Sequence, residues 1–511
     1  MSNHDEKPAR KKISLTAKTE GDKPERKHKP ARWSPLQRDR SKSAASEAKP
    51  AAKAEQRSHG PAAEGRTEKK HPPGHAGKAK GYREEGASGR PPRTPAKDGA
   101  YPRDGRDTRP TRSRDETGTE ATPRRRSTPQ APAQLKFFVP CPRGLEGELA
   151  KELIELGAAD AVAGSGGVKF SGDIALAWKV NLWSRLAIRV LQQVAEGNYR
   201  DEEDLYKVTL KQPWSDWFAV DKTIAIRTVA HNSPLKSLNF VTLRIKDAVC
   251  DRFRQDLEQR PNVDAREPNV PILIYLDQDR FTLYLDLTGE PLNRRGYRVE
   301  PAPAPLNENL AAALLKLSGW TPELPLLDPM MGGGTILLEA AMIALNMAPG
   351  IKRHFAFEHL ISFDKVEWTR LRKDAEAGQK EPQLLPIYGC DIDPRMIRAA
   401  GLNLKAAGLL DCVTLREGDV MAIPAPAEHG MIVSNPPYGV RLDTDATFYK
   451  GLGDALKQHF AGWTAWLISG DAEFPKGMGL AASRRIPLYN GPLECRLYEY
   501  KLIAGTMRKK T

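Results

Sequence analysis

Residues 326–335 read LLDPMMGGGT and run directly into an apolar segment at 336–345. A short apolar strand that ends in glycines before a helix lets the backbone approach a ligand closely, and the first amides of the helix face that ligand. No Lys-Ser or Lys-Thr pair follows the glycines, which argues against a loop that holds the phosphates of ATP or GTP. The stretch therefore predicts a small-molecule site at a strand end, with a purely structural glycine turn as the alternative.

The sequence around this stretch alternates between short apolar strands and helices. A helix through Leu310, Leu314 and Leu317 comes first. The strands are expected at 325–328, 385–391, 412–416, 430–434 and 465–469. This alternation predicts an α/β fold with a parallel, doubly wound, Rossmann-like sheet over 306–511. Residues 485–489 and 495–503, joined by Asn490-Gly491, predict a terminal antiparallel hairpin.

Acidic residues follow the next two predicted strands. Asp391 and Asp393 end the strand at 385–391, where a carboxylate can accept hydrogen bonds from ribose hydroxyls. The glycines lie further away than the usual spacing of about 20 residues, which an inserted helical segment at 338–380 explains. Either acid alone is equally consistent with capping a helix that begins near Pro394. Asp419 follows the strand at 412–416 and is expected to face an adenine amino group, with a surface loop residue as the alternative.

Residues 432–439 read IVSNPPYG, a strand that runs into two prolines and an aromatic residue. Pro436 and Pro437 fix the backbone and remove two donors, which leaves the Asn435 side-chain oxygen and the Pro436 carbonyl as acceptors on a stiff loop. Two such acceptors can hold an aromatic amino group, while Tyr438 stacks on the base. Because these bonds help to localise the amine lone pair on nitrogen, attack on a methyl donor then needs mainly positioning.

Residues 135–290 show a different, α+β pattern without a nucleotide loop, and we predict one compact unit there. Its expected strands are at 137–139, 167–170, 222–230, 272–276 and 281–287, and its expected helices are at 145–156, from Ile174 to about Val194, and at 241–256. Residues 291–305 contain Pro301, Pro303 and Pro305 and are interpreted as a semi-rigid linker.

The first 134 residues are predicted to be a disordered basic tail, because they contain very few large apolar side chains. Residues 1–130 contain 33 Lys plus Arg and 18 Asp plus Glu, whereas the whole chain has a net charge of +14. The remainder is therefore close to neutral and must bind nucleic acid through local patches. The tail is either a solubilising linker or a salt-sensitive tether to phosphates.

Five cysteines stand far apart, which favours a reducing, cytoplasmic location without structural zinc or disulfides. His354 and His359 are a poor ligand pair, so no metal is expected. No apolar run is long enough for a membrane span, and no membrane partner is expected.

At the Asn-Pro-Pro-Tyr motif the chain resembles class I methyltransferases. From about 136 to 511 it resembles the bacterial 23S ribosomal RNA guanine-N2 methyltransferases that carry a ferredoxin-like segment and a THUMP domain. The supporting runs are Arg143-Gly144-Leu145-Glu146, Leu182-Trp183-Ser184-Arg185, Arg260-Pro261-Asn262-Val263-Asp264 and Arg295-Gly296-Tyr297-Arg298. The resemblance implies transfer of a methyl group from S-adenosylmethionine to the N2 amine of a guanine in 23S ribosomal RNA. Ribosomal RNA, either free or in the assembling large subunit, would be the partner. The oligomeric state is left open, with a monomer as the default.

The resemblance also implies a role for individual residues. Those expected to line the methionine end of the cofactor are Asp328, Gly332, Gly334 and Thr335. Asp391 is expected to hold the ribose and Asp419 the adenine. The target amine and base would meet Asn435, Pro436, Pro437 and Tyr438. The THUMP part, about 178–288, would help to place RNA, with Arg244 and Lys246 as candidate contacts or, equally, as part of a solvated helix face. Where the family has Cys followed by Gly-Ser-Gly, this chain has Met331 and three glycines.

Four other functions have to be weighed against this one. Asn-Pro-Pro-Tyr also occurs in enzymes that methylate adenine in DNA or glutamine in protein, but their segments ahead of the glycine turn differ. A tRNA guanine-N2 methyltransferase of similar layout is a closer rival. A noncatalytic RNA-binding ribosome-assembly factor is the remaining alternative, and the intact acids and Asn435 argue against it.

Overall fold

The computed structural model describes residues 134–300, 306–437 and 446–503. The predicted disordered tail, the three linker prolines and Tyr438 lie outside these residues. The described chain forms two seven-stranded sheets, one on each side of residues 291–300 in the sequence.

The first sheet has the strand order β2-β3-β1-β4-β7-β6-β5. Its strands are β1 (Leu135–Pro140), β2 (Val162–Gly164), β3 (Gly167–Gly172), β4 (Leu191–Asn198), β5 (Ile224–His231), β6 (Val270–Asp277) and β7 (Arg280–Asp286). β4 pairs with β1 on one side and with β7 on the other, so residues 135–286 share one continuous sheet. The strands expected at 272–276 and 281–287 are confirmed and form the antiparallel pair β6 and β7.

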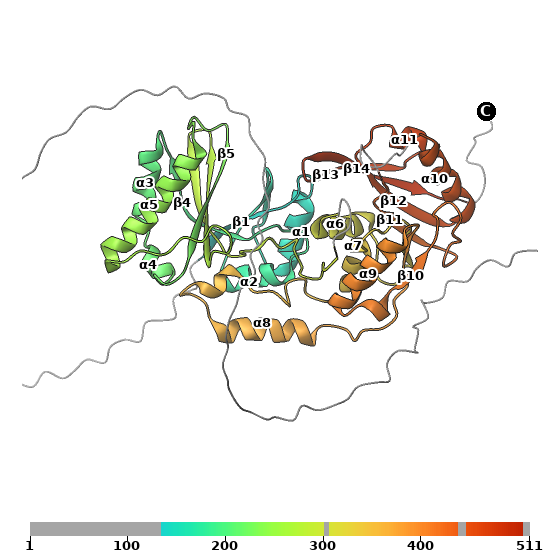
Figure 1. The fold of residues 1–511 in the computed structure, drawn as a ribbon, viewed down its shortest axis with the longest axis horizontal. Helices are drawn as coiled ribbons and strands as arrows, with labels where there is room; N and C mark the ends of the chain where they lie inside the picture. Colours follow the sequence, from blue (N-terminus) through green and yellow to red (C-terminus); the bar gives the residue numbers. More distant parts are fainter. Residues whose placement is uncertain (1–133, 301–305, 438–445, 504–511) are drawn as a thin grey trace, which may run out of the picture. The chain divides into compact units, whose positions relative to one another are not determined.

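Five helices accompany this sheet: α1 (Glu146–Leu156), α2 (Ile174–Trp183), α3 (Glu202–Leu210), α4 (Trp214–Trp217) and α5 (Leu238–Leu257). α1 ends at Gly157, whose φ of 117° only glycine adopts readily. α5 buries Val241, Ile245 and Val249, which recur at helical spacing along one face. Figure 1 shows α3 and α5 side by side near β5. The short strand β2 and the helices α3 and α4 were not among the predicted elements.

The helix expected from Ile174 to about Val194 is shorter, because α2 ends at Trp183 and residues 191–194 belong to β4. Ser184 adopts extended backbone there, and its hydroxyl donates to the buried carboxylate of Glu152. Glu152 also accepts from the backbone N–H of Arg185 at 3.1 Å. A carboxylate from α1 therefore binds the chain where α2 stops, and this tertiary contact overrides the apolar spacing that continues beyond Trp183.

The second sheet has the order β10-β9-β8-β11-β12-β14-β13. Its strands are β8 (Leu326–Asp328), β9 (Ile387–Asp391), β10 (Thr414–Glu417), β11 (Gly430–Ser434), β12 (Trp463–Ser469), β13 (Arg484–Asn490) and β14 (Leu493–Lys501). The first five are parallel, and β14 is antiparallel to both β12 and β13. The predicted doubly wound sheet and the terminal antiparallel hairpin are confirmed. The turn differs by one residue from the prediction, because Asn490 still pairs with Leu493 and the two-residue turn is Gly491-Pro492.

The remaining elements of residues 306–503 are α6 (Glu308–Ser318), α7 (Thr335–Ala344), α8 (Lys365–Ala377), α9 (Pro394–Ala407), α10 (Ala446–His459), α11 (Phe474–Gly477) and the 3₁₀ helices η2 (Ala356–His359) and η3 (Leu410–Cys412). Two of them reach the first sheet's side, since η2 contacts β6 and α8 contacts α2. Figure 1 shows α7 and α9 near one another beside the sheet. Gly389 in β9 allows α7 to pack closely, because a Cβ there would lie 2.3 Å from Leu337 Cδ1. α8 occupies the predicted insertion between the glycine turn and β9.

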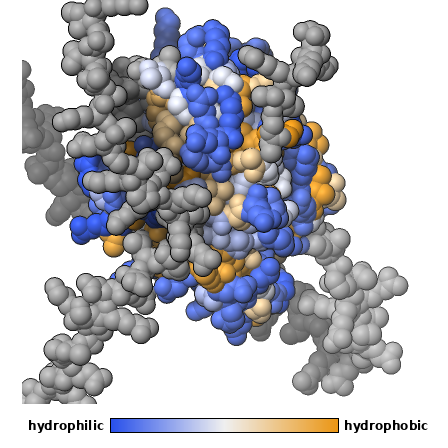
Figure 2. Space-filling model, turned by 90° about the vertical axis from the view of Figure 1, so that its right-hand side faces the viewer, coloured by the Kyte–Doolittle hydropathy of each residue, from blue (hydrophilic) through white to orange (hydrophobic). Residues whose placement is uncertain are grey.

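The surface that Figure 2 presents is mixed, with hydrophilic side chains interleaved among smaller hydrophobic areas. Among the described residues, no helix combines the length and the apolar character that a membrane crossing requires. All five cysteines are free and buried.

Candidate active site

The predicted site residues gather where the parallel strands end. β8 ends at Asp328, β9 at Asp391 and β11 at Ser434, and β8 pairs with both of the other strands. The carboxyl ends of parallel strands share one edge of a sheet, and this edge is where ligands bind in doubly wound folds. The topology thus brings the glycine turn, the two acids and the Asn435 loop to one edge.

The glycine turn has the backbone geometry that the sequence predicts. Gly332 and Gly334 have φ values of +51° and +78°, which residues with a side chain rarely adopt. A Cβ at Gly334 would also lie 3.0 Å from the Cβ of Ala400 on α9, whereas one at Gly332 would meet open space. Gly334 therefore allows α9 to pack against the turn, and Gly332 leaves room beside it.

Asp328 is buried at the end of β8 and accepts hydrogen bonds from two neighbours. The Ser434 hydroxyl donates at 2.6 Å and the Met330 backbone N–H at 3.3 Å. Burial raises the pKa of Asp328 to about 7, although the bond from Ser434 acts in the opposite direction. This acid thus holds its proton far more tightly than a carboxyl in water, and a cationic group placed beside it would favour the ionised form.

Asp391 and Asp393, at the end of β9, have different roles, one at the glycine turn and one as a helix cap. Asp393 caps α9 by accepting from the Arg395 backbone N–H at 2.9 Å. Asp391 instead accepts from the Gly332 backbone N–H at 2.9 Å, which ties the end of β9 to the glycine turn. Burial raises the pKa of Asp391. Only Asp391 therefore lies at the turn as a candidate ribose ligand.

Asp419 lies two residues beyond β10 and is exposed. Its carboxylate accepts from the Met421 backbone N–H at 2.9 Å, which orders the following turn. The structure therefore places Asp419 at the expected strand end, with a carboxylate that already orders a surface turn.

Asn435 follows β11 directly, and its side chain is half-buried. Among the described residues, which omit 438–445, its Oδ1 atom is buried without a hydrogen-bond partner. A buried amide oxygen without a partner is costly, and native proteins rarely retain one without a reason. Pro436 is buried and Pro437 half-buried beside it. The loop thus presents an acceptor that a substrate amine can satisfy.

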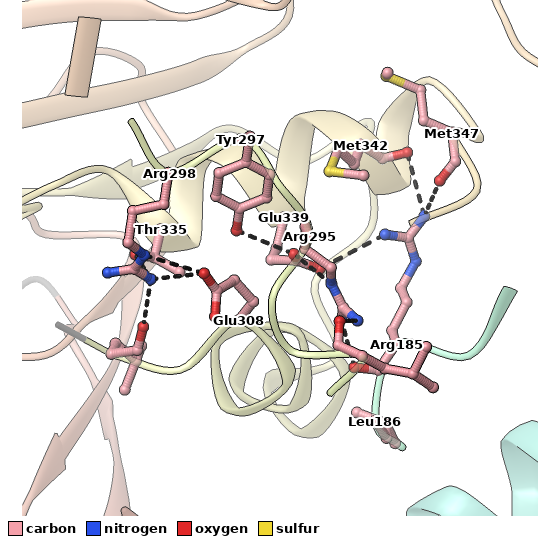
Figure 3. A network of polar contacts seen from close by, with 12 residues as sticks. Arg185, Leu186, Arg295, Tyr297, Arg298, Glu308, Thr335, Glu339, Met342 and Met347 are labelled. Atoms are coloured by element: carbon pink, nitrogen blue, oxygen red, sulfur yellow. Dashed lines mark hydrogen bonds and ion pairs between the residues drawn. The ribbon is translucent and has the colours of Figure 1, made fainter. Parts of the chain in front are cut away.

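Thr335 begins α7, and its hydroxyl accepts from the Arg298 guanidinium at 3.3 Å. Arg298 also donates to Glu308 at 2.9 Å, so it joins the first turns of α6 and α7, as Figure 3 shows. Asn403 on α9 donates to the Gly333 carbonyl at 3.1 Å and accepts from the Val299 backbone N–H at 3.0 Å. The segment around 298–300 therefore braces the glycine turn from two sides.

One turn further along α7, Glu339 is fully buried and binds three side chains (Figure 3). Arg295 and the Tyr297 hydroxyl each donate to its Oε1 at 3.2 Å, and Arg185 lies 3.6 Å from its Oε2. Arg185 also donates to the Met347 carbonyl at 2.7 Å. This Glu339 cluster connects the chain before β4 to the helix that follows the glycine turn.

The two candidate RNA contacts lie on α5 and are already ion-paired. Arg244 stacks over the Tyr206 ring at 4.0 Å and lies 2.5 Å from Glu203. Lys246 lies 2.7 Å from Asp247. Both side chains keep part of their surface exposed, so the geometry leaves their role in RNA binding a prediction.

Two residues of the site were not predicted from the sequence. Ser434 precedes Asn435 in the quoted motif, and its hydroxyl beside the loop could have indicated a hydrogen bond to a site residue. Arg298 belongs to a run that carries the family resemblance, but its partners lie on two distant helices. Within the described parts of the chain, no group of three or more His, Cys, Asp or Glu side chains could hold a metal ion.

Three family models match the chain. Residues 136–191 match the RlmL ferredoxin-like domain, residues 199–286 the THUMP domain, and residues 295–499 the model described as RMKL-like, methyltransferase domain.

Curated relatives agree with these matches. The chain is 40% identical over 370 residues to a Synechocystis protein named "Putative RNA methyltransferase slr0064", covering 72% of this chain and 96% of that protein. It is 40% identical to the "Ribosomal RNA large subunit methyltransferase K/L" of Syntrophotalea carbinolica, covering 72% of this chain and 54% of the relative. The Aeromonas hydrophila protein of the same name is 38% identical with the same coverage. The chain thus spans about half the length of these K/L relatives.

Solved structures show the same arrangement. The crystal structure of SMU.472, described as a putative methyltransferase complexed with SAH, has a TM-score of 0.67 and 32% identity, covering 74% of this chain and 99% of that one. TrmN from Thermus thermophilus has a TM-score of 0.54 at 19% identity, covering 72% of this chain and 100% of that one, and this likeness shows the fold alone.

Proposed function

The chain belongs to the family of RNA methyltransferases with an RMKL-like methyltransferase domain, and we propose that it methylates the exocyclic N2 amine of a guanine in 23S ribosomal RNA. S-adenosylmethionine is the methyl donor of this family. The names of the K/L relatives support the ribosomal substrate. The Asn435 side-chain oxygen at the end of β11, which has no hydrogen-bond partner among the described residues, supports an amine as the methyl acceptor. It is the observation on which the proposal depends most.

The residues at the sheet edge fit this donor. The open side of Gly332 and the buried carboxyl of Asp328 are proposed to receive its methionine end, where an ammonium group would favour ionised Asp328. Asp391 is proposed to accept from the ribose hydroxyls, and Asp419 from the adenine amino group. Gly334 keeps the turn in shape, while Thr335 helps to hold it through Arg298. When bound, the donor supplies a methyl group on a positively charged sulfur.

The Asn435 loop is proposed to orient the substrate amine. Its Oδ1 and the Pro436 carbonyl accept the two amine N–H bonds, which directs the nitrogen lone pair away from the ring. Pro437 stiffens the loop, and Tyr438 is proposed to stack on the guanine. The protein thereby contributes positioning and removal of water rather than a strong acid or base.

We further propose a division of labour along the chain. Residues 1–134 form a basic tail, 135–290 a ferredoxin-like plus THUMP unit, 291–305 a linker and 306–511 the methyltransferase domain. Arg244 and Lys246 on α5 are proposed to contact RNA phosphates. The five free, buried thiols suit work in the cytoplasm.

Methyl transfer to defined RNA tests the proposed function directly. The full chain is incubated with tritium-labelled S-adenosylmethionine and transcribed 23S ribosomal RNA, 16S ribosomal RNA or bulk tRNA. We expect label in 23S RNA alone, and mass spectrometry of the digested RNA should identify N2-methylguanosine. If only tRNA is labelled, the substrate is tRNA and not 23S ribosomal RNA. If neither free RNA nor the RNA of isolated large subunits is labelled, the enzymatic proposal is contradicted.

A further inference from the structure

A second pocket lies close to the proposed active site. It has a volume of about 260 Å³, and its polar lining includes Arg143, Asn293, Asn307, Asn309 and Tyr489. Arg143 follows β1, Asn309 lies in the first turn of α6, and Tyr489 lies near the end of β13. We call it the asparagine pocket.

The strand register places the asparagine pocket at the same sheet edge as the Asn435 loop. Ser434 pairs with Leu467 in β12, and Ser469 at the end of β12 pairs with Arg496 in β14. Arg496 pairs with Pro487, so Tyr489 and the turn at Gly491 lie beyond the carboxyl end of β12. β13 is three strands away from β11, a separation of about 14 Å at the usual strand spacing.

Asn309 gives this pocket an unmet hydrogen-bonding need. The residue is only 2% exposed, and among the described residues its Oδ1 is buried with no hydrogen-bond partner. The neighbouring Asn307 directly precedes α6 as its N-cap residue, and among the described residues its side chain does not accept the usual cap hydrogen bond. A native protein rarely leaves a buried acceptor unsatisfied, so a ligand with an N–H group is the natural partner.

Two other lining residues provide a flat, charged surface. The Arg143 guanidinium lies 4.5 Å from the centroid of the Tyr489 ring, which holds this exposed side chain in place. Guanidinium planes and aromatic rings are the surfaces on which unpaired bases of RNA stack, and amide side chains bind base edges. The pocket is smaller than the sites that hold drug-sized ligands, roughly 300 Å³ or more, which suits a single base.

We propose that the asparagine pocket binds one unpaired base of the substrate RNA, within a few nucleotides of the methylated guanine. The base stacks against the Arg143 and Tyr489 pair, and one of its N–H groups donates to Asn309 Oδ1. This inference rests on the proposed function, because it assumes an RNA substrate at the Asn435 loop. It adds a second point of recognition, which selects the sequence or the unpaired state around the target.

Three variants of the full chain test the pocket by steady-state methylation of 23S RNA. Asn309→Leu removes the acceptor at similar volume, while Tyr489→Ala and Arg143→Ala remove the stacking wall. We expect the KM for RNA to rise about tenfold in each, with kcat, donor affinity and melting temperature unchanged. Arg484→Ala is the matched control, because this exposed arginine of β13 also stacks on an aromatic ring, that of Trp466, but does not line the pocket. An unchanged KM in all three pocket variants would overturn the proposal.

A cross-linking experiment separates failure of the pocket from failure of the proposed function, because it needs no methyl transfer. The full chain is irradiated with 23S RNA transcribed with 4-thiouridine, and cross-linked peptides are identified by mass spectrometry. We expect a cross-link in the peptide that contains Tyr489, which disappears in Tyr489→Ala and persists in Arg484→Ala. Cross-links confined to other peptides would contradict base binding in the asparagine pocket, even if methylation of guanine is observed. The expected cross-link without any methylation would support base binding in the asparagine pocket and contradict the proposed enzymatic function.

Discussion

The Glu339 cluster and the sheet edge at Asp328 and Asn435 are both buried polar regions, but they differ in how far their buried groups are compensated by oppositely charged side chains. Glu339 has Arg295, Tyr297 and Arg185 around one carboxylate. At the sheet edge, burial raises the pKa of Asp328 to about 7, and the Asn435 oxygen has no partner among the described residues. The first region balances its buried charges within the chain, although among the described residues Glu339 Oε2 and Arg185 Nη1 lie 3.6 Å apart and make no hydrogen bond. The second region leaves capacity for a ligand.

This difference separates a structural polar cluster from a binding site more reliably than burial does. Removing one member of a completed buried ion pair leaves a charge without compensation. Removing an acceptor that the folded chain does not use costs the fold little, and its loss is felt only when the substrate binds. Substitutions in the two regions should therefore affect different measurements.

The largest effect is expected from Asn435→Ala. Methyl transfer to RNA should fall by at least about a thousandfold, toward the upper range for loss of a single preorganised group in an active site. The melting temperature and the donor affinity measured by calorimetry should stay unchanged, because Oδ1 has no partner among the described residues. Loss of donor binding, or a clear drop in melting temperature, would show that Asn435 has a structural role like that of Glu339.

Glu339→Gln should have the largest effect on the fold. Arg295 and Arg185 would remain buried without the carboxylate, which lowers the free energy of unfolding by about 3–5 kcal/mol. Urea denaturation followed by tryptophan fluorescence measures this change. Glu367→Gln is the control, because this carboxylate pairs with the largely exposed Arg370, and such surface pairs contribute about 1 kcal/mol or less. Equal effects of the two substitutions would contradict the comparison.

Asp328 should make stability depend on pH. Its pKa is about 7 in the folded chain and near 3.8 when unfolded, so from pH 4 to pH 7 only the folded state holds the proton. The free energy of unfolding therefore falls as the pH rises through this window, by about 4 kcal/mol at most. Asp328→Asn should lack this contribution while keeping the bond from Ser434. Urea denaturation at pH 4.5 and 7.5 compares the two proteins, and identical pH slopes would show that Asp328 is ionised in the fold.

The smallest effect is expected from Arg244→Ala. This guanidinium already pairs with Glu203 and stacks on Tyr206, so RNA affinity should fall less than about fivefold, or 1 kcal/mol. Plotted against salt on logarithmic axes, the affinity should show a slope smaller by about one. Filter binding at several salt concentrations measures this, with Arg254→Ala on the same helix as the control. An unchanged slope would show that Arg244 does not contact an RNA phosphate.

Sequence alone predicted much of the second sheet, since each short apolar strand is bounded by glycine, proline or acid. It also brought Asp328, Asp391 and Asn435 to one edge, because parallel strands end together. It could not decide between Asp391 and Asp393, whose roles depend on a bond to Gly332 fifty-nine residues away. The end of α2 and the partners of Arg298 were missed for the same reason, because each depends on contacts between distant segments.

α7 carries both regions of this comparison, with Thr335 at its first turn and Glu339 one turn later. Four residues of helix span only about 6 Å, and a helix resists bending over so short a length. The residue that pairs with Arg185 and the residue that follows the glycine turn are thus held on one rigid helix. One extra residue between Thr335 and Glu339 would rotate the two side chains by about 100° relative to one another, so the spacing along α7 fixes the direction in which each of them points.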